Sequence, residues 1–445
     1  MKKIKDEIEK IKEEKAIPIT FLRTPTYFAE IIYDQGISSF LVYNLVDGFI
    51  SKTKNLDFES KSYYSSSSPD VVDFIPLPSG IEEYGTEKEL IQDIEQFIKK
   101  WVAIDDDYLK IVIYYVLFTW VYDAFCEVPY LRILADLGSG KTRLGVHVLG
   151  QIVYKPIRTT AASSISSIFR IISSIKGTLI VDEADIDDSD KNNEFVQVLN
   201  CGYTEDGKIL RTVGVGPSLQ SRPFSVFGPK ILISREHFKD HALESRCLPV
   251  ILKETQNSNI PLILDHSIKE EGLKLRNKLL LWRFRHLQNA TGNMDQSFLQ
   301  YDIATRFKQL FLLLSSVVSE ESKIDLKKYA EKIQKESINR RQETPEGEII
   351  TYLWENRESL EVTCGEVAEF YNRDKDQKEK KSAKSIGWYL RERLGIQTFR
   401  VTSGDNKDCR AIKPNISIIQ PLAQKYGVIA EKSEKESEST SEIPF

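Results

Sequence analysis

The residues with the clearest chemical signature follow a short apolar segment in the first half of the chain. Tyr130–Leu134 leads into Ala135-Asp136-Leu137-Gly138-Ser139-Gly140-Lys141-Thr142, and helical spacing resumes over Leu144–Leu149. Between a strand and a helix, these residues have the form of a Walker A loop. Its glycines let successive backbone N–H groups turn toward a phosphate, and the new helix adds its positive end. The sequence therefore predicts a site for a nucleoside triphosphate.

The side chains of this loop have distinct expected roles. Lys141 should reach the β- and γ-phosphates, and the Thr142 hydroxyl should bind Mg²⁺. Ala135 stands where the strict motif has glycine, and alanine can replace glycine wherever φ stays negative. We expect the residues that hold ATP to be Ala135, Gly138, Ser139, Gly140, Lys141 and Thr142.

An acidic pair follows a second apolar segment, about 40 residues beyond the loop. Thr178–Val181 has strand character and ends in Asp182-Glu183, the pattern of a Walker B motif. We expect Asp182 to hold the magnesium ion through water and Glu183 to polarise the attacking water as general base. The alternative is an ordinary buried strand with exposed acidic residues at its end.

The composition bounds the kind of protein. The chain has 445 residues, of which 41% are hydrophobic and 29% charged, and its net charge is −5. A single core stops growing near about 250–300 residues, so more than one domain is expected. The five cysteines form no Cys-x-x-C pair, the amino terminus lacks an apolar signal segment, and the apolar run Ile111–Tyr122 is too short to span a membrane. We therefore expect a cytoplasmic protein with reduced thiols and no membrane partner, whose acidic net charge does not exclude local contact with DNA.

Changes of pattern along the chain predict five segments. Residues 1–84 are expected to form a small β-rich domain behind a charged leading helix, with strands near Ala16–Phe21, Ser39–Tyr43 and Val71–Ile75. In residues 85–265, helices precede an alternation of strands and helices, which indicates an α/β core. We expect a helical lid over residues 266–344, a further small domain over 345–427 and a disordered tail over 428–445.

Two β-leaning runs separated by Gly216–Ser221 predict a hairpin ahead of the last strands of the core. Here the chain resembles the AAA+ ATPases of mobile-element primase-helicases and, more distantly, the minichromosome-maintenance helicases. The resemblance covers about residues 85–345 and is strongest from Tyr130 to Pro249. It implies an AAA+ P-loop ATPase core whose hairpin projects into the pore of a ring and grips DNA. The hairpin cations are Lys208, Arg211 and Arg222.

The same resemblance assigns roles to three further residues. Ser234 ends the strand that carries the sensor 1 residue, although many relatives have asparagine there. Arg246 lies in a segment similar to the arginine-finger segment, which enters the ATP site of a neighbouring subunit and suits a permanently charged guanidinium. Arg306 is a candidate sensor 2 residue. For both arginines the alternative is an ordinary surface or structurally paired side chain.

The carboxyl-terminal segment has the pattern of a winged helix-turn-helix. A capping box at Thr363 and Glu366 opens a short helix, Ser382–Leu394 forms the expected recognition helix, and a hairpin follows with its turn at Gly404–Asn406. Residues 373–413 carry twelve Lys/Arg against six Asp/Glu. We expect DNA contacts from Lys384, Arg391 and Arg393, and we expect the two aromatic residues of this helix, Trp388 and Tyr389, to belong to the core. The alternative is a protein-docking module with solvated charges.

Together these features predict an ATP-dependent DNA helicase or translocase that forms a ring, a hexamer, and acts in replication of a mobile genetic element. Single-stranded DNA would lie in the pore, and duplex or forked DNA would contact the winged helix. Two alternatives stay open: an AAA+ initiator or loader that unwinds nothing, and a defence or signalling NTPase. The hairpin favours the first hypothesis, because a loader has no need to pull a strand through its centre.

Overall fold

A computed structural model describes residues 16–65, 74–136, 138–160, 163–185, 190–213, 219–238, 240–254, 257–300, 303, 305–402 and 408–429. The chain divides into two compact units, the first ending at Ala330 and the second beginning at Glu331. The predicted leading helix and most of the predicted carboxyl-terminal tail lie outside the described residues, as do the Gly404–Asn406 turn and most of the predicted strand at Val71–Ile75. In the described part of the chain, no helix combines the length and the apolarity needed to cross a membrane.

Strands fill the first described part of the chain, in the region where the sequence predicts them. They form two small sheets, ordered β2-β3-β4-β5 and β1-β7-β6. A core of Ala29, Phe40 and Leu56 lies among them. The strands are β1 (Ile17–Ile19), β2 (Phe21–Arg23), β3 (Tyr27–Asp34), β4 (Ile37–Asn44), β5 (Ile50–Thr53), β6 (Asn55–Phe58) and β7 (Lys61–Ser65).

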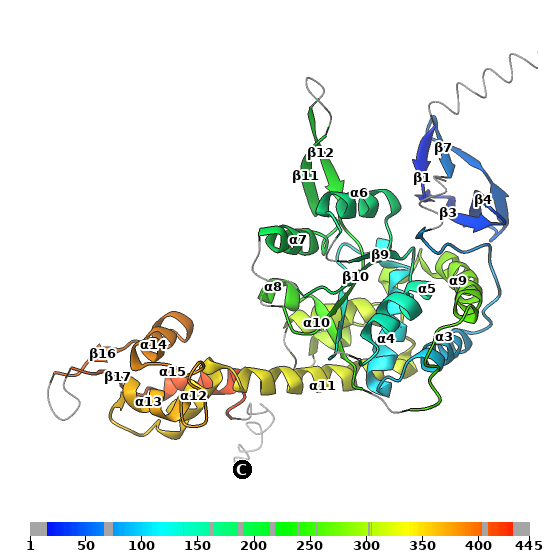
Figure 1. Cartoon of the computed structure of the whole chain (residues 1–445). Coiled ribbons are helices and arrows are strands. Elements are labelled where there is room, and N and C mark those ends of the chain that lie inside the picture. The colour runs from blue at the N-terminus through cyan, green and yellow to red at the C-terminus, as the bar shows by residue number, and fades with distance from the viewer. Residues whose placement is uncertain are drawn as a thin grey trace, which may run out of the picture. The chain divides into compact units, whose positions relative to one another are not determined.

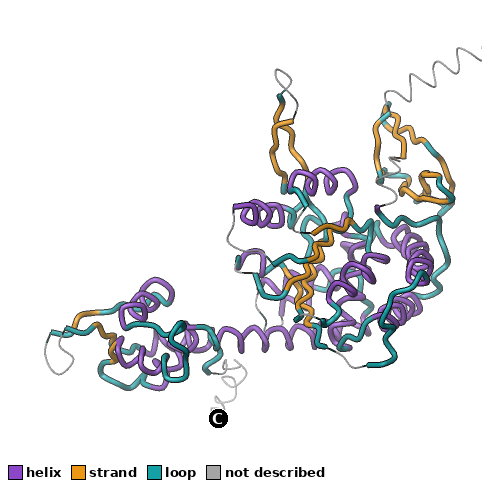
Figure 2. The backbone as a smooth tube through the Cα atoms, viewed as in Figure 1, coloured by secondary structure: helices purple, strands orange, loops and turns teal. Residues whose placement is uncertain are grey.

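A five-stranded parallel sheet forms the centre of the first unit (Figures 1 and 2). Its order is β14-β8-β13-β10-β9, which places the strand before the Walker A loop between two neighbours. The strands are β8 (Tyr130–Leu134), β9 (Ile157–Thr160), β10 (Leu179–Asp182), β13 (Lys230–Ser234) and β14 (Cys247–Ile251). The structure is thus a mixed α/β fold, and its nearly continuous apolar strands are typical of a parallel sheet covered on both faces.

Helices surround this sheet. A capping box at Thr86 and Glu89 opens α3, and the apolar α4 is almost completely buried. The helix after the Walker A loop is π-type over Arg143–Leu149 and continues as α5, and both α3 and α9 pack against it. The helices of the first unit are α3 (Glu87–Trp101), α4 (Asp106–Thr119), α5 (Gly150–Ile152), α6 (Ile165–Ile175), α7 (Asp190–Cys201), α8 (His241–Glu244), α9 (Ser267–His286) and α10 (Thr305–Ser315). The helix α11 (Lys323–Gln342) begins in the first unit and continues into the second.

The second unit combines short helices with a three-stranded sheet of order β15-β17-β16. Its core includes Ile350, Leu353, Val367, Ile386 and Leu390. A capping box at Thr363 and a cap at Ser382 begin two of its helices, as the sequence predicts. The elements are α12 (Pro345–Glu355), β15 (Val362–Thr363), α13 (Cys364–Tyr371), α14 (Ala383–Trp388) with its π-type continuation Tyr389–Arg393, β16 (Phe399–Arg400), β17 (Arg410–Ile412) and α15 (Ile416–Lys425).

Candidate functional site

The loop between β8 and its helix adopts a conformation that requires glycine. Gly138 and Gly140 have φ angles of +84° and +83°, in the left-handed region that other residues rarely occupy. A side chain at either position would meet no atom within 4 Å, so the requirement is conformational and not spatial. Ala135 is not among the residues with positive φ, which is the condition under which alanine replaces glycine here. The Ser139 hydroxyl closes the loop by donating to Asp136 O at 2.6 Å.

The structure brings the two predicted motifs together. Because all strands of the sheet are parallel, the residues after β8 and at the end of β10 meet at the same edge, although β13 lies between these strands. The Thr142 hydroxyl donates to Asp182 Oδ1 at 3.2 Å. Oδ1 also accepts the Glu183 backbone N–H at 3.0 Å, whereas Oδ2 has no hydrogen-bond partner among the described residues. A hydroxyl and a carboxylate are hard oxygen donors of the kind that Mg²⁺ binds, so these residues fit the expected ion.

The two other charged residues of this edge also have distinctive geometry. Lys141 Nζ donates to Ala135 O at 3.3 Å, so the ammonium lies over its own loop. Glu183 is exposed and has a φ angle of +55°, which is unusual for a residue with a side chain. Backbone strain of this kind is concentrated at functional sites, where the surrounding structure holds it in place.

The opposite end of the Walker A helix is capped by two arginines that sequence reasoning missed. Arg158 donates to Gly150 O and Arg276 donates to Gln151 O, each at 2.6 Å. Both guanidiniums therefore lie at the negative end of the helix dipole, whose positive end faces the loop. Burial lowers the pKa of Arg276 to about 9, and the neighbouring Arg158 charge adds to this effect. No local pattern marks these arginines, because their partners are backbone carbonyls in distant segments.

Gly145 fixes how closely the Walker A helix approaches the sheet. A Cβ atom at this position would lie 2.4 Å from Cδ1 of Ile233 on β13, so a side chain here would require the Ile233 side chain to shift. The sequence signal is a glycine inside a helical pattern, which usually has a packing reason.

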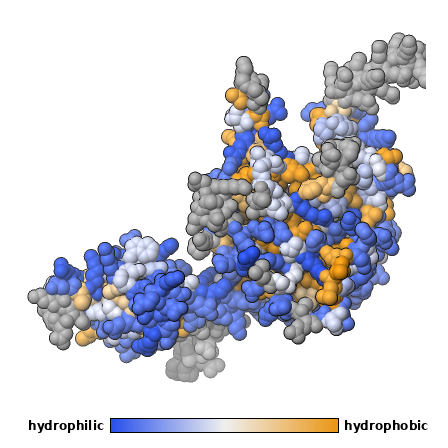
Figure 3. All heavy atoms as spheres, in the orientation of Figure 1, coloured by the Kyte–Doolittle hydropathy of each residue, from blue (hydrophilic) through white to orange (hydrophobic). Residues whose placement is uncertain are grey.

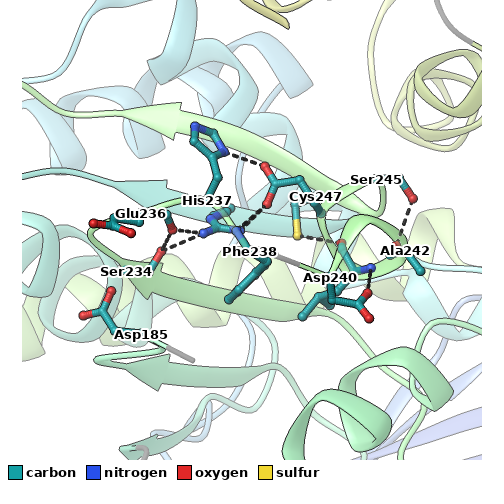
Figure 4. A network of polar contacts seen from close by, with 12 residues as sticks. Asp185, Ser234, Glu236, His237, Phe238, Asp240, Ala242, Ser245 and Cys247 are labelled. Carbon is teal, nitrogen blue, oxygen red and sulfur yellow. Dashed lines mark hydrogen bonds and ion pairs between the residues drawn. The ribbon is translucent and has the colours of Figure 1, made fainter. Parts of the chain in front are cut away.

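Ser234 is present at the predicted strand end but its hydroxyl is already engaged. It is 1% exposed, donates to Glu236 O at 3.1 Å and accepts Arg132 Nη2 at 3.1 Å. Figure 4 shows Ser234 within a network that also includes Glu236, His237 and Phe238. The single hydroxyl proton is therefore used inside the network, and the sensor 1 role of Ser234 stays a prediction.

Arg132 is the centre of this network. The sequence analysis did not identify it, because it lies in a strand whose other residues are apolar. It is fully buried on β8, pairs with Glu244 and lies 3.5 Å from the centre of the Phe238 ring. Glu244 also contacts His237 at 2.6 Å. Burial raises the pKa of Glu244, but the His237 hydrogen bond and the Arg132 charge outweigh burial and bring it below its ordinary value. The available signal was a lone arginine among apolar residues, since buried arginines are almost always paired.

Arg246 and Arg306 lie together, and not at the phosphate loop of their own chain. Their guanidiniums lie 5.3 and 4.4 Å from the centre of the Tyr203 ring. Cys247 is in register with Tyr130, so Arg246 lies at the edge where β8 begins, whereas the Walker A loop follows its end. Four strand residues separate these edges by about 13 Å. The arginine-finger role of Arg246 and the sensor 2 role of Arg306 stay predictions.

The predicted hairpin is present and projects from the first unit (Figure 1). It consists of β11 (Lys208–Val213) and β12 (Gln220–Ser225), and residues 214–218 of its tip lie outside the described part. Lys208 and Arg222 are exposed. Arg211 pairs with Glu194 and lies 5.4 Å from the centre of the Phe169 ring, and its contact with DNA stays a prediction. Apolar side chains are also exposed on the hairpin (Figure 3), with Leu210 70% and Leu219 57% accessible.

In the second unit, the predicted recognition helix exposes most of its expected cations. Lys384 and Arg393 are exposed, and Arg393 Nε lies 3.9 Å from Glu346 Oε1. Arg391 is half-buried and donates to the Thr398 hydroxyl at 3.1 Å. Trp388 is 44% exposed, so its predicted place in the core was wrong, whereas Tyr389 packs against the core. The helix simply turns this large ring outward.

No protein-family model matches the chain, and no curated protein matches it. Among solved structures, the apo A form of the NrS-1 C-terminal region is similar with a TM-score of 0.41 and 13% identity, covering 87% of this chain and 97% of that chain. A JCV helicase structure is similar with a TM-score of 0.24 and 12% identity, covering 55% of this chain and 74% of that chain. An inhibitor-bound JCV helicase has a TM-score of 0.23 and 11% identity, covering 53% and 75%.

Proposed function

We propose that this protein is an AAA+ ATPase that couples ATP hydrolysis to translocation along DNA or to its unwinding. The observation that carries the proposal is the 3.2 Å hydrogen bond between Thr142 and Asp182, residues from two motifs about 40 positions apart. An apolar strand with accidental acidic residues at its end has no reason to place a carboxylate on the hydroxyl of a glycine-rich loop. The left-handed glycines and the strained Glu183 support the same assignment.

In this proposal the residues of the site have different roles in ATP hydrolysis. Loop N–H groups and Lys141 hold the phosphates, and Thr142 with Asp182 would hold Mg²⁺, which neutralises phosphate charge when bound. Glu183 takes the proton of the water that attacks the γ-phosphate. Its side chain is exposed and thus accessible to that water.

The proposal includes a ring, which we take to be a hexamer. Arg246 lies at the edge of the sheet where β8 begins, away from its own Walker A loop, and Arg306 contacts the same Tyr203 ring, which supports action on the γ-phosphate of a neighbouring subunit. A guanidinium supplied in this way stabilises charge in the transition state. The pair on Tyr203 therefore favours catalysis between subunits.

DNA contacts are assigned to the hairpin and to the second unit. A ring would repeat the exposed Lys208 and Arg222 around a narrow channel, where the summed field attracts a single strand. The second unit, a winged helix in this proposal, would bind duplex or forked DNA through Lys384 and its neighbours. Replication of a mobile genetic element is the process that we propose for this activity.

An ATPase assay with and without single-stranded DNA tests the proposal. We expect wild-type turnover that DNA stimulates, and loss of turnover in both Lys141→Ala and Glu183→Gln. Glu183→Gln should still bind ATP, because the amide keeps the shape of the side chain and removes only its basicity. Turnover at one rate regardless of DNA would refute the translocase, and a wild-type protein that never binds nucleotide would refute the ATPase.

The same assay tests the ring. Arg246→Ala should abolish turnover and leave ATP affinity nearly unchanged, since the finger acts on the transition state. Mixing it with Lys141→Ala should restore some activity, because a mixed interface joins an intact loop to an intact finger. Absence of restored activity would contradict catalysis between subunits.

A further inference from the structure

Two guanidiniums in the second unit converge on one hydroxyl. Arg391, near the end of the helix Ala383–Arg393, donates from Nη1 to Thr398 Oγ1 at 3.1 Å. Arg410, the first residue of β17, donates from its own Nη1 to the same oxygen at 3.0 Å. Thr398 directly precedes β16, so this arrangement joins the predicted recognition helix to the hairpin that follows it.

Among the described residues, this cluster has hydrogen-bond donors and positive charges that lack acceptors and counter-charges. A threonine hydroxyl has two acceptor lone pairs and one proton to donate. Both lone pairs are occupied by the arginines, and the proton has no acceptor among the described residues. Neither guanidinium has a carboxylate within ion-pair distance in the described part of the chain, whereas neighbouring Arg400 lies 3.2 Å from Asp408. The cluster therefore presents donors and positive charge without an anion.

The packing below the cluster keeps both arginines in place. A Cβ atom on Gly387 would lie 3.4 Å from Arg391 Nη1 and 4.0 Å from Cδ of Arg410, so both side chains lie against helix backbone that carries no side chain. Burial raises the pKa of the adjacent Cys364 thiol, and the charges of these two arginines oppose that shift. Two like charges held this close repel each other, and a bound anion would remove the repulsion.

We propose that Arg391, Thr398 and Arg410 form a binding site for one phosphodiester group of duplex DNA. Guanidiniums suit a phosphate because their planar N–H groups match its oxygens. The exposed Lys384 and Trp388 share the helix face with Gly387 and Arg391, at spacings of three, four and seven residues. This face is the one that a recognition helix turns toward a groove, so the cluster lies where the backbone beside that groove passes. The inference rests on the proposed function of the second unit in DNA binding.

A contact of this kind positions the protein and reads no sequence. Removing one guanidinium should therefore weaken binding to all duplexes alike and lower the dependence on salt. Removing only the Thr398 hydroxyl should weaken binding and leave the salt dependence unchanged, because no charge is lost.

The test is fluorescence anisotropy of a short labelled duplex with the full chain at several salt concentrations. We expect Arg391→Gln and Arg410→Gln each to weaken binding roughly tenfold and to lower the slope of log affinity against log salt by about 1. Thr398→Val should weaken binding with the slope of the wild type. Arg400→Gln is the matched control, since it removes the same charge from an arginine already paired with Asp408. It should bind the duplex nearly as the wild type does.

Binding by Arg391→Gln and Arg410→Gln that equals that of Arg400→Gln would overturn the proposal. Competition by millimolar inorganic phosphate at constant ionic strength would also overturn it, because the site would then serve the free anion. Circular dichroism of each variant identifies loss of folding, and Arg410→Lys, which keeps the charge, should bind better than Arg410→Gln.

Stimulation of ATPase activity by single-stranded DNA separates this proposal from the proposed function. If single-stranded DNA still stimulates the ATPase activity but these substitutions leave duplex binding unchanged, only the phosphate-site proposal is refuted. If the protein has no ATPase activity but these substitutions weaken duplex binding, only the proposed motor function is refuted.

Discussion

Arg132 shows how one buried charge can organise a functional surface. It is held in the strand before the Walker A loop and pairs with Glu244, which belongs to the segment that carries Arg246. It also binds the Ser234 hydroxyl on the neighbouring strand. A buried pair of this kind adds little net stability, but loss of one partner leaves an uncompensated charge. We therefore interpret Arg132 as a positioning residue that fixes the segment carrying Glu244 and Arg246 relative to the sheet.

The charge of Glu244 makes this positioning sensitive to pH. Its pKa is lowered in the folded protein, so the unfolded chain takes up the proton first as pH falls. The stabilisation is complete above the unfolded pKa of about 4.3 and is lost as pH falls through the folded value. We expect Glu244→Gln to lower the thermal unfolding temperature at neutral pH, and the difference from wild type to shrink toward acid pH. Thermal unfolding across this range checks the prediction, with exposed Glu205→Gln as control; a difference that stays constant would contradict it.

The hairpin β11–β12 contacts helices α6 and α7 on one side and exposes other side chains to solvent. Phe224 packs on Phe169 of α6 with ring centres 4.9 Å apart, and Arg211 pairs with Glu194 of α7. Arg211 and Arg222 lie directly opposite each other, which would be unfavourable without the nearby carboxylate. Glu194 thus neutralises one arginine of this opposed pair and leaves Arg222 as its exposed charge.

Different outcomes are expected for the cations of this hairpin. Lys208→Gln combined with Arg222→Gln should keep basal ATPase activity and lose most of its stimulation by single-stranded DNA, because both exposed charges are removed. Arg211→Gln should lower the unfolding temperature modestly and keep the stimulation, because this guanidinium serves a structural ion pair. ATPase titrations with DNA measure both effects. Equal loss of stimulation in the two proteins would contradict this division.

Within the first unit, the β-rich segment is joined to the α/β core through a buried ionic network. Glu30 of β3 is 1% exposed, binds Lys155 at 3.0 Å through Oε2 and accepts Arg283 Nε of α9 at 2.6 Å. Arg283 also forms a bidentate pair with Asp123. Burial lowers the pKa of Lys155 to about 8, and the Glu30 charge opposes that shift. These contacts join the β-rich segment to the α/β core within the first unit.

Glu30→Gln should therefore destabilise the whole first unit. It keeps the shape of the side chain but leaves Lys155 and part of the Arg283 charge without a partner, a loss of about 3–5 kcal/mol for a broken buried pair. Chemical unfolding monitored by circular dichroism measures the change. Glu82→Gln, an exposed position before α3, should leave stability within about 0.5 kcal/mol of wild type. A wild-type unfolding curve for Glu30→Gln would show that the network carries no stability.

The amino-acid sequence by itself determined the features that depend on neighbouring residues. The glycine-rich loop, the apolar strand with its acidic end, the caps at Thr86 and Thr363 and the hairpin follow from local backbone preference and periodicity, and the structure contains each of them. The helix α15 was missed, and Pro421 in its interior is a residue type that argues against a helix.

Tertiary structure alone decided which side chains meet. Thr142 forms a hydrogen bond with Asp182, and Arg211 forms an ion pair with Glu194. Arg246 and Arg306 both contact the Tyr203 ring, and Glu30 forms ion pairs with Lys155 and Arg283. In each case the partners are at least 17 residues apart along the chain. The energy of such contacts depends on burial and on the distance between charges, and both are set only when the sheet and its helices have packed.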